Sequence, residues 1–215
     1  MIEFPDPRQT DENGLLAVGG DLTTENLLSA YTKGIFPWPQ EGFPILWFSP
    51  EERGILDFDD FHIPKSVDKE LRKKEFRITV NEGFDRVIEN CSKIPRSEQD
   101  GTWILPEMLE AYKKLNQEGH AHSVECWREK DLVGGLYGVY IKGIFSGESM
   151  FYKESGASKA CLIYLVDHLK SLGNTWMDIQ MVTPVLELFG GDYISRDEFL
   201  KRLEASQKTL NFLPR

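Results

Sequence analysis

The sequence predicts an α+β protein in which a mixed β-sheet is flanked by helices. Three consecutive segments, at residues 121–127, 132–140 and 144–151, read as strands separated by short turns, which predicts an antiparallel meander. A helical pattern follows at 158–172, and one more strand pattern follows it at 175–180. A strand reached through a crossover helix is expected to lie parallel to the strand before that helix, which makes the sheet mixed.

Composition sets wide limits on this fold. The chain has 215 residues, of which 40% are hydrophobic and 12% aromatic. This is enough for a packed core in one sizeable domain, or in a core domain with a smaller N-terminal piece. No apolar run approaches the ~20 residues that span a bilayer, so no membrane partner is expected. The first residues lack the basic and apolar regions of a signal peptide, which predicts a cytoplasmic protein.

Charge and cysteine content narrow the possible partners. The formal net charge is −10, and a uniformly acidic surface would repel nucleic acid, so an RNA partner requires a local basic patch. The three cysteines, Cys91, Cys126 and Cys161, form no metal or redox motif. The pair His120 and His122 has no third ligand at a suitable spacing, so we expect no metal.

Residues 1–52 are predicted to form a small N-terminal α/β domain. Residues 13–22 read as a turn, a short apolar strand and a Gly-Gly turn. Thr23 can cap a helix that Gly34 ends. The two proline-containing segments that follow this helix are predicted to be packed loops, because proline opposes a continued helix.

Trp38 lies between two prolines in the first of these loops. It is either a core residue or a rigid platform on which a ring of a ligand stacks. The composition changes near Arg53, where we place a loose boundary. Residues 53–215 are therefore assigned to a second domain.

A basic stripe is predicted on the helix that begins after Pro64. The cations fall at i, i+4, i+7 and i+8, which is one face of a helix. They are Lys65, Lys69, Arg72 and Lys73. In an acidic protein, such a stripe is either an ordinary solvated face or a surface that binds phosphate.

The segments between this helix and the meander alternate between strand and helix. Residues 76–80 read as a strand, and Asn81 can cap the helix after it. Trp103 falls in a loop. Pro106 then opens a helix that Gly119 ends.

Polar residues interrupt two of the predicted strands. Glu148 stands among small and apolar residues in the third strand of the meander, and Asp178 and Gln180 do so in the strand after the helix. An isolated buried carboxylate costs roughly several kcal/mol, so each acid is either hydrogen-bonded for structure or functional. Glycines in the middle strand predict a bulge or a close backbone approach. They are Gly134, Gly135 and Gly138.

By analogy, this order of elements matches the acetyltransferase fold, and the sequence therefore predicts a GNAT-like mixed sheet flanked by helices. In that fold, strands near the middle of the sheet splay and open a cleft for an acyl donor and an amine. Glu148 and Asp178 are then expected on adjacent strands, with their two segments facing one another.

Several motifs spread over residues 13–180 are shared with one family. They are N-G-L-L-A-V-G-G-D-L, Y-T-K-G-I-F-P-W, I-L-W-F-S-P, G-T-W-I, G-H-A-H-S-V-E-C-W, L-V-G-G-L-Y-G-V, F-S-G-E-S-M-F and D-I-Q. With these motifs the chain resembles the bacterial leucyl/phenylalanyl-tRNA–protein transferases. No single motif is specific, but together they are, and they cover most of the chain.

The resemblance implies an aminoacyltransferase. Such an enzyme takes leucine or phenylalanine, and less well methionine, from a charged tRNA. It joins this residue to the N-terminal arginine or lysine of an acceptor protein, which marks that protein for degradation by the N-end rule. The family is cytoplasmic and needs no metal or other cofactor, because an aminoacyl ester is already activated. We expect a monomer.

The resemblance also implies roles for individual residues. Asp178 polarises Gln180, which lies at the acceptor amine, and Glu148 holds the amine or the aminoacyl-adenosine end. The terminal adenosine is contacted by Trp38 and Trp103. The donor side chain enters an apolar pocket formed by Leu136, Phe145, Met150, Leu162, Leu165 and Met177. The tRNA backbone is bound by Lys65, Lys69, Arg72 and Lys73.

Two positions depart from the family pattern, and two other functions compete. After D-I-Q the family usually has a His and then a Ser, but this chain has Val185 and Leu188, which puts the contacts of those side chains in doubt. One alternative is a CoA-dependent N-acyltransferase, but residues 152–159 lack the glycine-rich loop that holds pyrophosphate. The other alternative is a non-catalytic module that binds tRNA or peptide.

Overall fold

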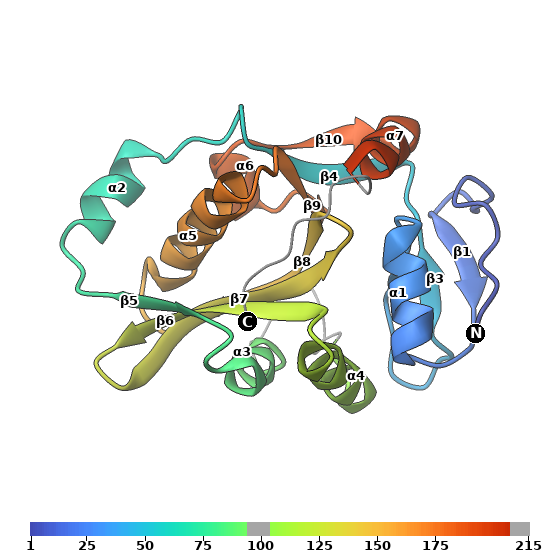
Figure 1. Ribbon diagram of the computed structural model, residues 1–215, viewed down its shortest axis with the longest axis horizontal. Coiled ribbons are helices and arrows are strands. Elements are labelled where there is room, and N and C mark those ends of the chain that lie inside the picture. The colour runs from blue at the N-terminus through green and yellow to red at the C-terminus, as the bar shows by residue number, and fades with distance from the viewer. Residues whose placement is uncertain (94–103, 207–215) are drawn as a thin grey trace.

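Two β-sheets organise the computed structural model, which describes residues 1–93 and 104–206 (Figure 1). The small sheet has the order β1-β3-β2 and is formed by β1 (Leu15–Val18), β2 (Phe36–Pro37) and β3 (Leu46–Phe48). The two segments predicted to be packed loops therefore contribute short strands. Proline is tolerated in β2 because β2 is an edge strand.

The large sheet has the order β10-β4-β9-β8-β7-β6-β5. Its strands are β4 (Glu52–Asp57), β5 (Arg77–Val80), β6 (Ala121–Arg128), β7 (Asp131–Ile141), β8 (Ile144–Tyr152), β9 (Trp176–Gln180) and β10 (Gly191–Ser195). The predicted meander β6-β7-β8 is confirmed, and β9 lies parallel to β8 as predicted. The remaining pairs of this sheet are antiparallel. The fold is therefore α+β with a mostly antiparallel mixed sheet.

Helices cover both faces of the large sheet. They are α1 (Thr24–Thr32), α2 (Lys65–Leu71), α3 (Phe84–Cys91), α4 (Pro106–Gln117), α5 (Ala157–Ser171), α6 (Pro184–Leu188) and α7 (Arg196–Ser206). Figure 1 places α5 on one face and α3 and α4 on the other. In the part of the chain that the structure describes, no helix is long and apolar enough to cross a membrane.

Each face has its own buried core. The α5 core contains Leu136, Phe145 and Met177 from the strands, packed with α5. The core on the opposite face contains Tyr137 of β7 together with Tyr112 of α4, and it continues into residues of the small sheet and α1. The N-terminal residues thus share one core with the large sheet, and side chains from α1 reach its surface.

β8 contains a β-bulge at Glu148. Tyr137 of β7 pairs with Ser149, whereas the next residue, Gly138, pairs with Gly147, so Glu148 is an extra residue in the strand. A Cβ on Gly138 would lie 2.5 Å from the Phe145 ring. The glycines of the middle strand therefore mark both a bulge and a close approach, as predicted.

Two local predictions need correction. Asn81 does not cap α3; it has φ 59°, and its side chain accepts a hydrogen bond from the Ser123 N–H. The α3 helix begins after Gly83, and Glu125 of β6 accepts the Glu82 N–H at 3.3 Å instead. The basic helix is shorter than predicted, because α2 ends at Leu71. By contrast, Thr23 caps α1 as predicted, through a bond from the Asn26 N–H.

Candidate active site

Asp178 lies in a buried ion pair with Arg53. The Arg53 Nε donates to Asp178 Oδ1 at 2.8 Å, and its Nη2 donates to Oδ2 at 2.7 Å, which is a bidentate pair. Both side chains are 2% exposed. Ser146 of β8 also donates to Asp178 Oδ2, at 3.0 Å. The buried charge of Asp178 is therefore compensated within the protein.

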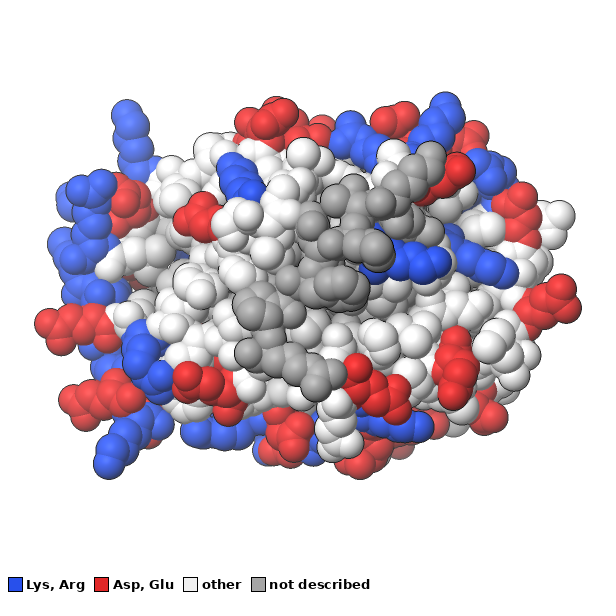
Figure 2. Space-filling model, in the orientation of Figure 1, with Lys and Arg blue, Asp and Glu red and all other residues white. Residues whose placement is uncertain are grey.

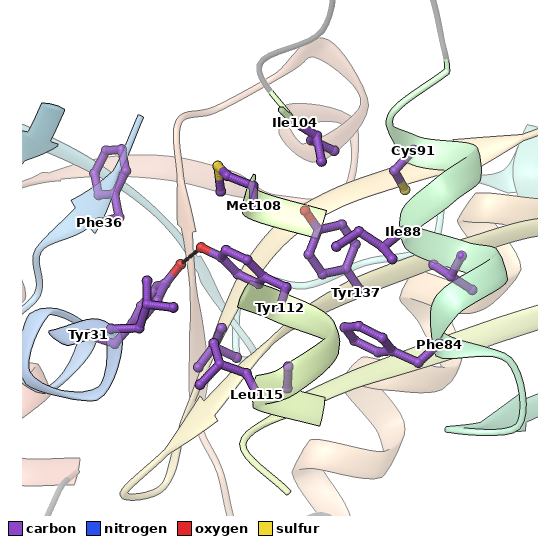
Figure 3. Close-up of a cluster of buried hydrophobic side chains, with 14 of the residues drawn as sticks. Tyr31, Phe36, Phe84, Ile88, Cys91, Ile104, Met108, Tyr112, Leu115 and Tyr137 are labelled. Atoms are coloured by element: carbon purple, nitrogen blue, oxygen red, sulfur yellow. Dashed lines mark hydrogen bonds between the residues drawn. The ribbon is translucent and has the colours of Figure 1, made fainter. Parts of the chain in front are cut away.

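Glu148 is the acceptor at the centre of a second group, the Glu148 cluster, which also contains Tyr31, Tyr112 and Gln180. Glu148 Oε1 accepts from the Tyr31 hydroxyl at 2.7 Å and from Gln180 Nε2 at 2.9 Å. Glu148 Oε2 accepts from the Tyr112 hydroxyl at 3.3 Å. The two tyrosine hydroxyls also contact each other, so these three contacts share two hydroxyl protons, and Figure 3 shows the hydroxyls meeting between α1 and α4.

Burial raises the pKa of Glu148 to about 7. The hydrogen bond from Tyr31 opposes this rise, the negative charge of Asp178 adds to it, and Tyr112 and Arg53 oppose it further. Burial also raises the pKa of Tyr31 and of Tyr112 well above the usual range, so both remain hydrogen-bond donors. Glu148, which is half-buried, can thus gain or lose a proton near neutral pH.

Gln180 ends β9 in an unusual conformation. Its φ is 60°, in the left-handed region that glycine favours and that costs other residues free energy. Asp178 Oδ1 accepts the Gln180 main-chain N–H at 3.0 Å, which holds this conformation, while the side-chain amide reaches Glu148. In this structure Asp178 therefore contacts the main chain of Gln180, and Glu148 contacts its amide.

The two segments that contain Glu148 and Asp178 face one another, as predicted. Within the described residues, Ser146 and Asp178 form the single register pair between β8 and β9. Two residues further along each strand, Glu148 and Gln180 are joined by their side chains. The carboxylates thus lie on adjacent strands, on the face of the sheet that α1 and α4 cover.

The six apolar residues predicted to bind the donor side chain lie together on the other face. Five of them are buried in the α5 core and Met150 packs against it. The five are Leu136, Phe145, Leu162, Leu165 and Met177. This core and Glu148 therefore lie on opposite faces of the sheet.

Of the two tryptophans that are predicted to contact the adenosine, the structure describes Trp38. Trp38 is half-buried beside the core around α1, with its ring 6.4 Å from Phe36 in an edge-on arrangement. Its main-chain N–H donates to the Leu46 carbonyl, which fixes the loop on β3. Trp103 lies outside the described residues.

The four residues of the predicted basic stripe are exposed, but α2 contains Lys65 and Lys69, whereas Arg72 and Lys73 follow its end at Leu71. Figure 2 shows blue side chains gathered at the left edge of the molecule, where Figure 1 places α2. All four side chains are exposed, and Arg72 is in addition paired with Asp68 at 3.0 Å. The stripe therefore presents three lysines and one arginine whose charge is partly compensated.

The sequence of this chain is similar to that of one known protein family. The family profile described as "Leucyl/phenylalanyl-tRNA protein transferase" matches residues 55–204, and the profile of its N-terminal domain matches residues 20–51. The chain belongs to the leucyl/phenylalanyl-tRNA protein transferase family. It is therefore an enzyme of the transferase class, and the predicted family is confirmed.

Individual transferases of this family are similar over nearly the whole chain. A leucyl/phenylalanyl-tRNA–protein transferase of Maridesulfovibrio salexigens is 50% identical over 94% of this chain and 84% of its own length. One from Syntrophus aciditrophicus is 49% identical over 96% and 86%. One from Flavobacterium johnsoniae is 48% identical over 94% and 95%.

Sequence reasoning missed three members of the site in this family member. The sequence places only a loose domain boundary near Arg53, and Tyr31 and Tyr112 fall within two predicted helices with no sign of a polar role. An arginine next to a glycine and two apolar residues in β4 was the available signal for Arg53. Of the two departures from the family pattern, Val185 is half-buried beside the α5 core, and Leu188 is 43% exposed.

Proposed function

We propose that the protein transfers leucine or phenylalanine, and less well methionine, from aminoacyl-tRNA to the N-terminal arginine or lysine of acceptor proteins, which marks them for degradation by the N-end rule. The observation that carries this proposal is the hydrogen bond between Gln180 and Glu148 across β8 and β9, within a chain of this family. It gives an amine two adjacent polar partners.

The reaction needs few groups. The amine nitrogen attacks the ester carbonyl, the new C–N bond forms, and the ester C–O bond breaks to release the ribose hydroxyl. One amine proton is removed, and one proton reaches the leaving oxygen, so no redox agent or nucleotide is consumed. An α-amine has a pKa of about 7.7–8.0, so a usable fraction is neutral near pH 7.

Glu148 is the group that receives the amine proton in this proposal. Its pKa of about 7 suits a proton acceptor near neutral pH. Asp178 is less suited, because it is held in a buried bidentate ion pair with Arg53. Asp178 instead holds the main chain of Gln180, and the Gln180 side chain orients the amine beside Glu148.

Two groups of residues bind the aminoacyl end of the charged tRNA. Trp38 and Trp103 contact the terminal adenosine. The donor side chain passes between β8 and β9 into the α5 core, where it meets Leu136, Phe145, Met150, Leu162, Leu165 and Met177. Each methylene in such a pocket is worth only ~1–3 kcal/mol, which explains why methionine is tolerated.

The basic stripe holds the tRNA backbone. Lys65, Lys69 and Lys73 are exposed, and Arg72 stands beside them in a protein of net charge −10. Contacts to phosphate position an RNA without reading its sequence, which suits an enzyme that uses several tRNAs.

We also propose the wider setting of this activity. The large sheet with its helices forms an acetyltransferase-like catalytic domain at 53–215, and residues 1–52 form the N-terminal domain. The enzyme works in the cytoplasm as a monomer and uses no metal or other cofactor.

The deciding experiment follows radiolabelled amino acid from charged tRNA to peptides that begin with Arg, Lys or Ala. We expect label on the Arg and Lys peptides and none on the Ala peptide. Binding of charged tRNA without transfer would favour the non-catalytic module. Tight binding of acetyl-CoA, measured by calorimetry, would favour the CoA-dependent acyltransferase.

A further inference from the structure

Arg53 lies where three parts of the molecule meet. It belongs to β4 and is 2% exposed. Its guanidinium stacks on Phe36 of β2, at 4.5 Å from the ring centre, and on Phe199 of α7, at 4.6 Å. Stacking on two rings fixes the plane of the guanidinium, and the plane fixes the directions of its N–H groups.

Those N–H groups serve two different segments. Nε and Nη2 are used by Asp178, as described above, and Nη1 donates to the Gly34 carbonyl at 3.2 Å. Gly34 ends the turn after α1 and is followed by β2, with Trp38 directly after it. A single side chain thus bonds to the start of the Trp38 segment and to the carboxylate that holds Gln180.

These contacts form one continuous chain of hydrogen bonds. It runs from the Gly34 carbonyl through Arg53 to Asp178, from Asp178 to the Gln180 main chain, and from the Gln180 side chain to Glu148. A shift of Arg53 would therefore move both ends, the Trp38 segment and the Gln180 amide, relative to each other.

We propose that Arg53 is a positioning residue that holds the donor-binding segment of Trp38 in register with the acceptor-binding amide of Gln180. The inference rests on the proposed transfer reaction, because it assigns one reactant to each end of the chain of hydrogen bonds. Arg53 itself touches neither reactant. Its effect is on the distance between ester and amine, and a misplacement of about 1 Å can cost on the order of 100-fold in rate.

The negative charge of Asp178 does not by itself require an arginine at position 53. A lysine would supply the positive charge that Asp178 needs, but its ammonium is a point charge without a planar fork. It could not serve both carboxylate oxygens and the Gly34 carbonyl while stacked between Phe36 and Phe199. Arginine is therefore needed for geometry.

The test is Arg53→Lys, assayed for transfer with saturating acceptor peptide and varied charged tRNA. We expect kcat to fall ~10–100-fold while KM for charged tRNA stays within about twofold, because the basic stripe is untouched. The matched control is Arg128→Lys. Arg128 forms a bidentate pair with Glu154, at 2.7 Å for each bond, on β6 outside the site, and its replacement is expected to leave kcat unchanged.

A second variant covers the case in which Arg53→Lys does not fold. Phe36→Leu removes one of the two stacking rings and leaves every charge in place, and we expect kcat to fall several-fold at constant KM. Its control is Phe4→Leu, which removes a ring packed on Trp47. A folded Arg53→Lys or Phe36→Leu enzyme with wild-type kcat, or with a raised KM as its sole defect, overturns the inference. Absence of transfer by the wild-type protein would instead overturn the proposed function.

Discussion

The side-chain amide of Gln180 donates to Glu148 at 2.9 Å and so joins the end of β9 to the middle of β8, two strands that share one register pair in the described structure. Glu148 is the extra residue of a bulge, and Gln180 has a positive φ. Both backbone features are unfavourable in an ordinary strand. Such features are frequent next to active sites, so their coincidence at one hydrogen bond supports the proposed site.

Replacing Glu148 with glutamine is expected to reduce transfer strongly while preserving the fold. Glutamine can still accept from Tyr31 and Gln180 through its oxygen and can donate to Tyr112, but it cannot take up a proton at neutral pH. We expect kcat to fall roughly 100- to 10,000-fold, the range of general-base catalysis, with tRNA affinity unchanged. Steady-state transfer assays and tRNA filter binding measure the two quantities. Retention of more than a tenth of kcat would exclude Glu148 as the proton acceptor.

The raised pKa of Glu148 also predicts how stability depends on pH. The pKa is near 4.5 in the unfolded chain and about 7 in the folded protein, so the folded state binds the proton more tightly. Protonated Glu148 therefore contributes to the stability of the folded state. This contribution is complete below pH 4.5 and is lost as pH rises through 7. Its size is at most about 3 kcal/mol, and less to the extent that the half-buried side chain contacts water.

The check is urea unfolding of the wild type and Glu148→Gln between about pH 5 and pH 8.5, a range that brackets the folded pKa. The wild type should lose stability relative to the variant over this interval, because only the wild type must ionise Glu148 in the folded state. Parallel curves for the two proteins would show that Glu148 titrates at its ordinary pKa.

Much of the fold could be predicted because it is encoded locally. The meander, α5 and β9 each show a hydrophobic period within one segment, and turns separate them. By contrast, β4 begins with two charged residues, Glu52 and Arg53, and shows no such period. Its place between β10 and β9 depends on partners more than a hundred residues away, such as Asp178, which is 125 residues from Arg53.

The sequence identified residues of the proposed site, but it could not predict their hydrogen-bond partners. Polar residues among apolar ones identified Glu148, Asp178 and Gln180, and the family resemblance supplied the role expected of Gln180. The bulge at Glu148 was signalled by Gly138 but could not be assigned to one residue, because its position depends on the pairing with β7. A tyrosine such as Tyr31 on the apolar face of a helix reads as core, and its hydroxyl partner is determined by tertiary packing.

Asp178→Asn is expected to lower stability as well as activity. It leaves the buried Arg53 without its charge partner, and breaking a buried ion pair costs about 3–5 kcal/mol. The comparison is Glu154→Gln, which breaks a more exposed pair with Arg128 and should cost much less. Equal loss in urea unfolding for the two variants would mean that Asp178 does not depend on Arg53 for burial.

Charge reversal of the basic stripe should affect tRNA and leave chemistry intact. With Lys65, Lys69 and Lys73 changed to glutamate, we expect KM for charged tRNA to rise and its salt dependence to flatten, by roughly 0.9 in the logarithmic slope for each phosphate that the protein ceases to neutralise. Arg72→Ala should have a smaller effect, because Asp68 already compensates that charge. Transfer measured between low and high salt distinguishes the variants, and an unchanged salt slope in the triple variant would remove the stripe from the tRNA interface.

Gln180→Gly separates the strain at this residue from its function. Glycine adopts φ 60° without steric cost, so the substitution relieves backbone strain, although it also removes the hydrogen bond to Glu148. We expect the free energy of unfolding to change by less than about 1 kcal/mol, because the two effects oppose each other. Transfer should nevertheless fall by more than about tenfold, since the amide that orients the amine is gone.

Gln180→Asn completes this comparison. It keeps an amide but shortens the side chain by one methylene, so the amide can no longer reach Glu148 while the main chain stays bonded to Asp178. If reach is what matters, Gln180→Asn should lose as much activity as Gln180→Gly, at equal tRNA affinity. If Gln180→Asn instead transfers like the wild type, the amide acts without contacting Glu148. In that case the strained backbone at Gln180 has a purpose other than aiming its side chain.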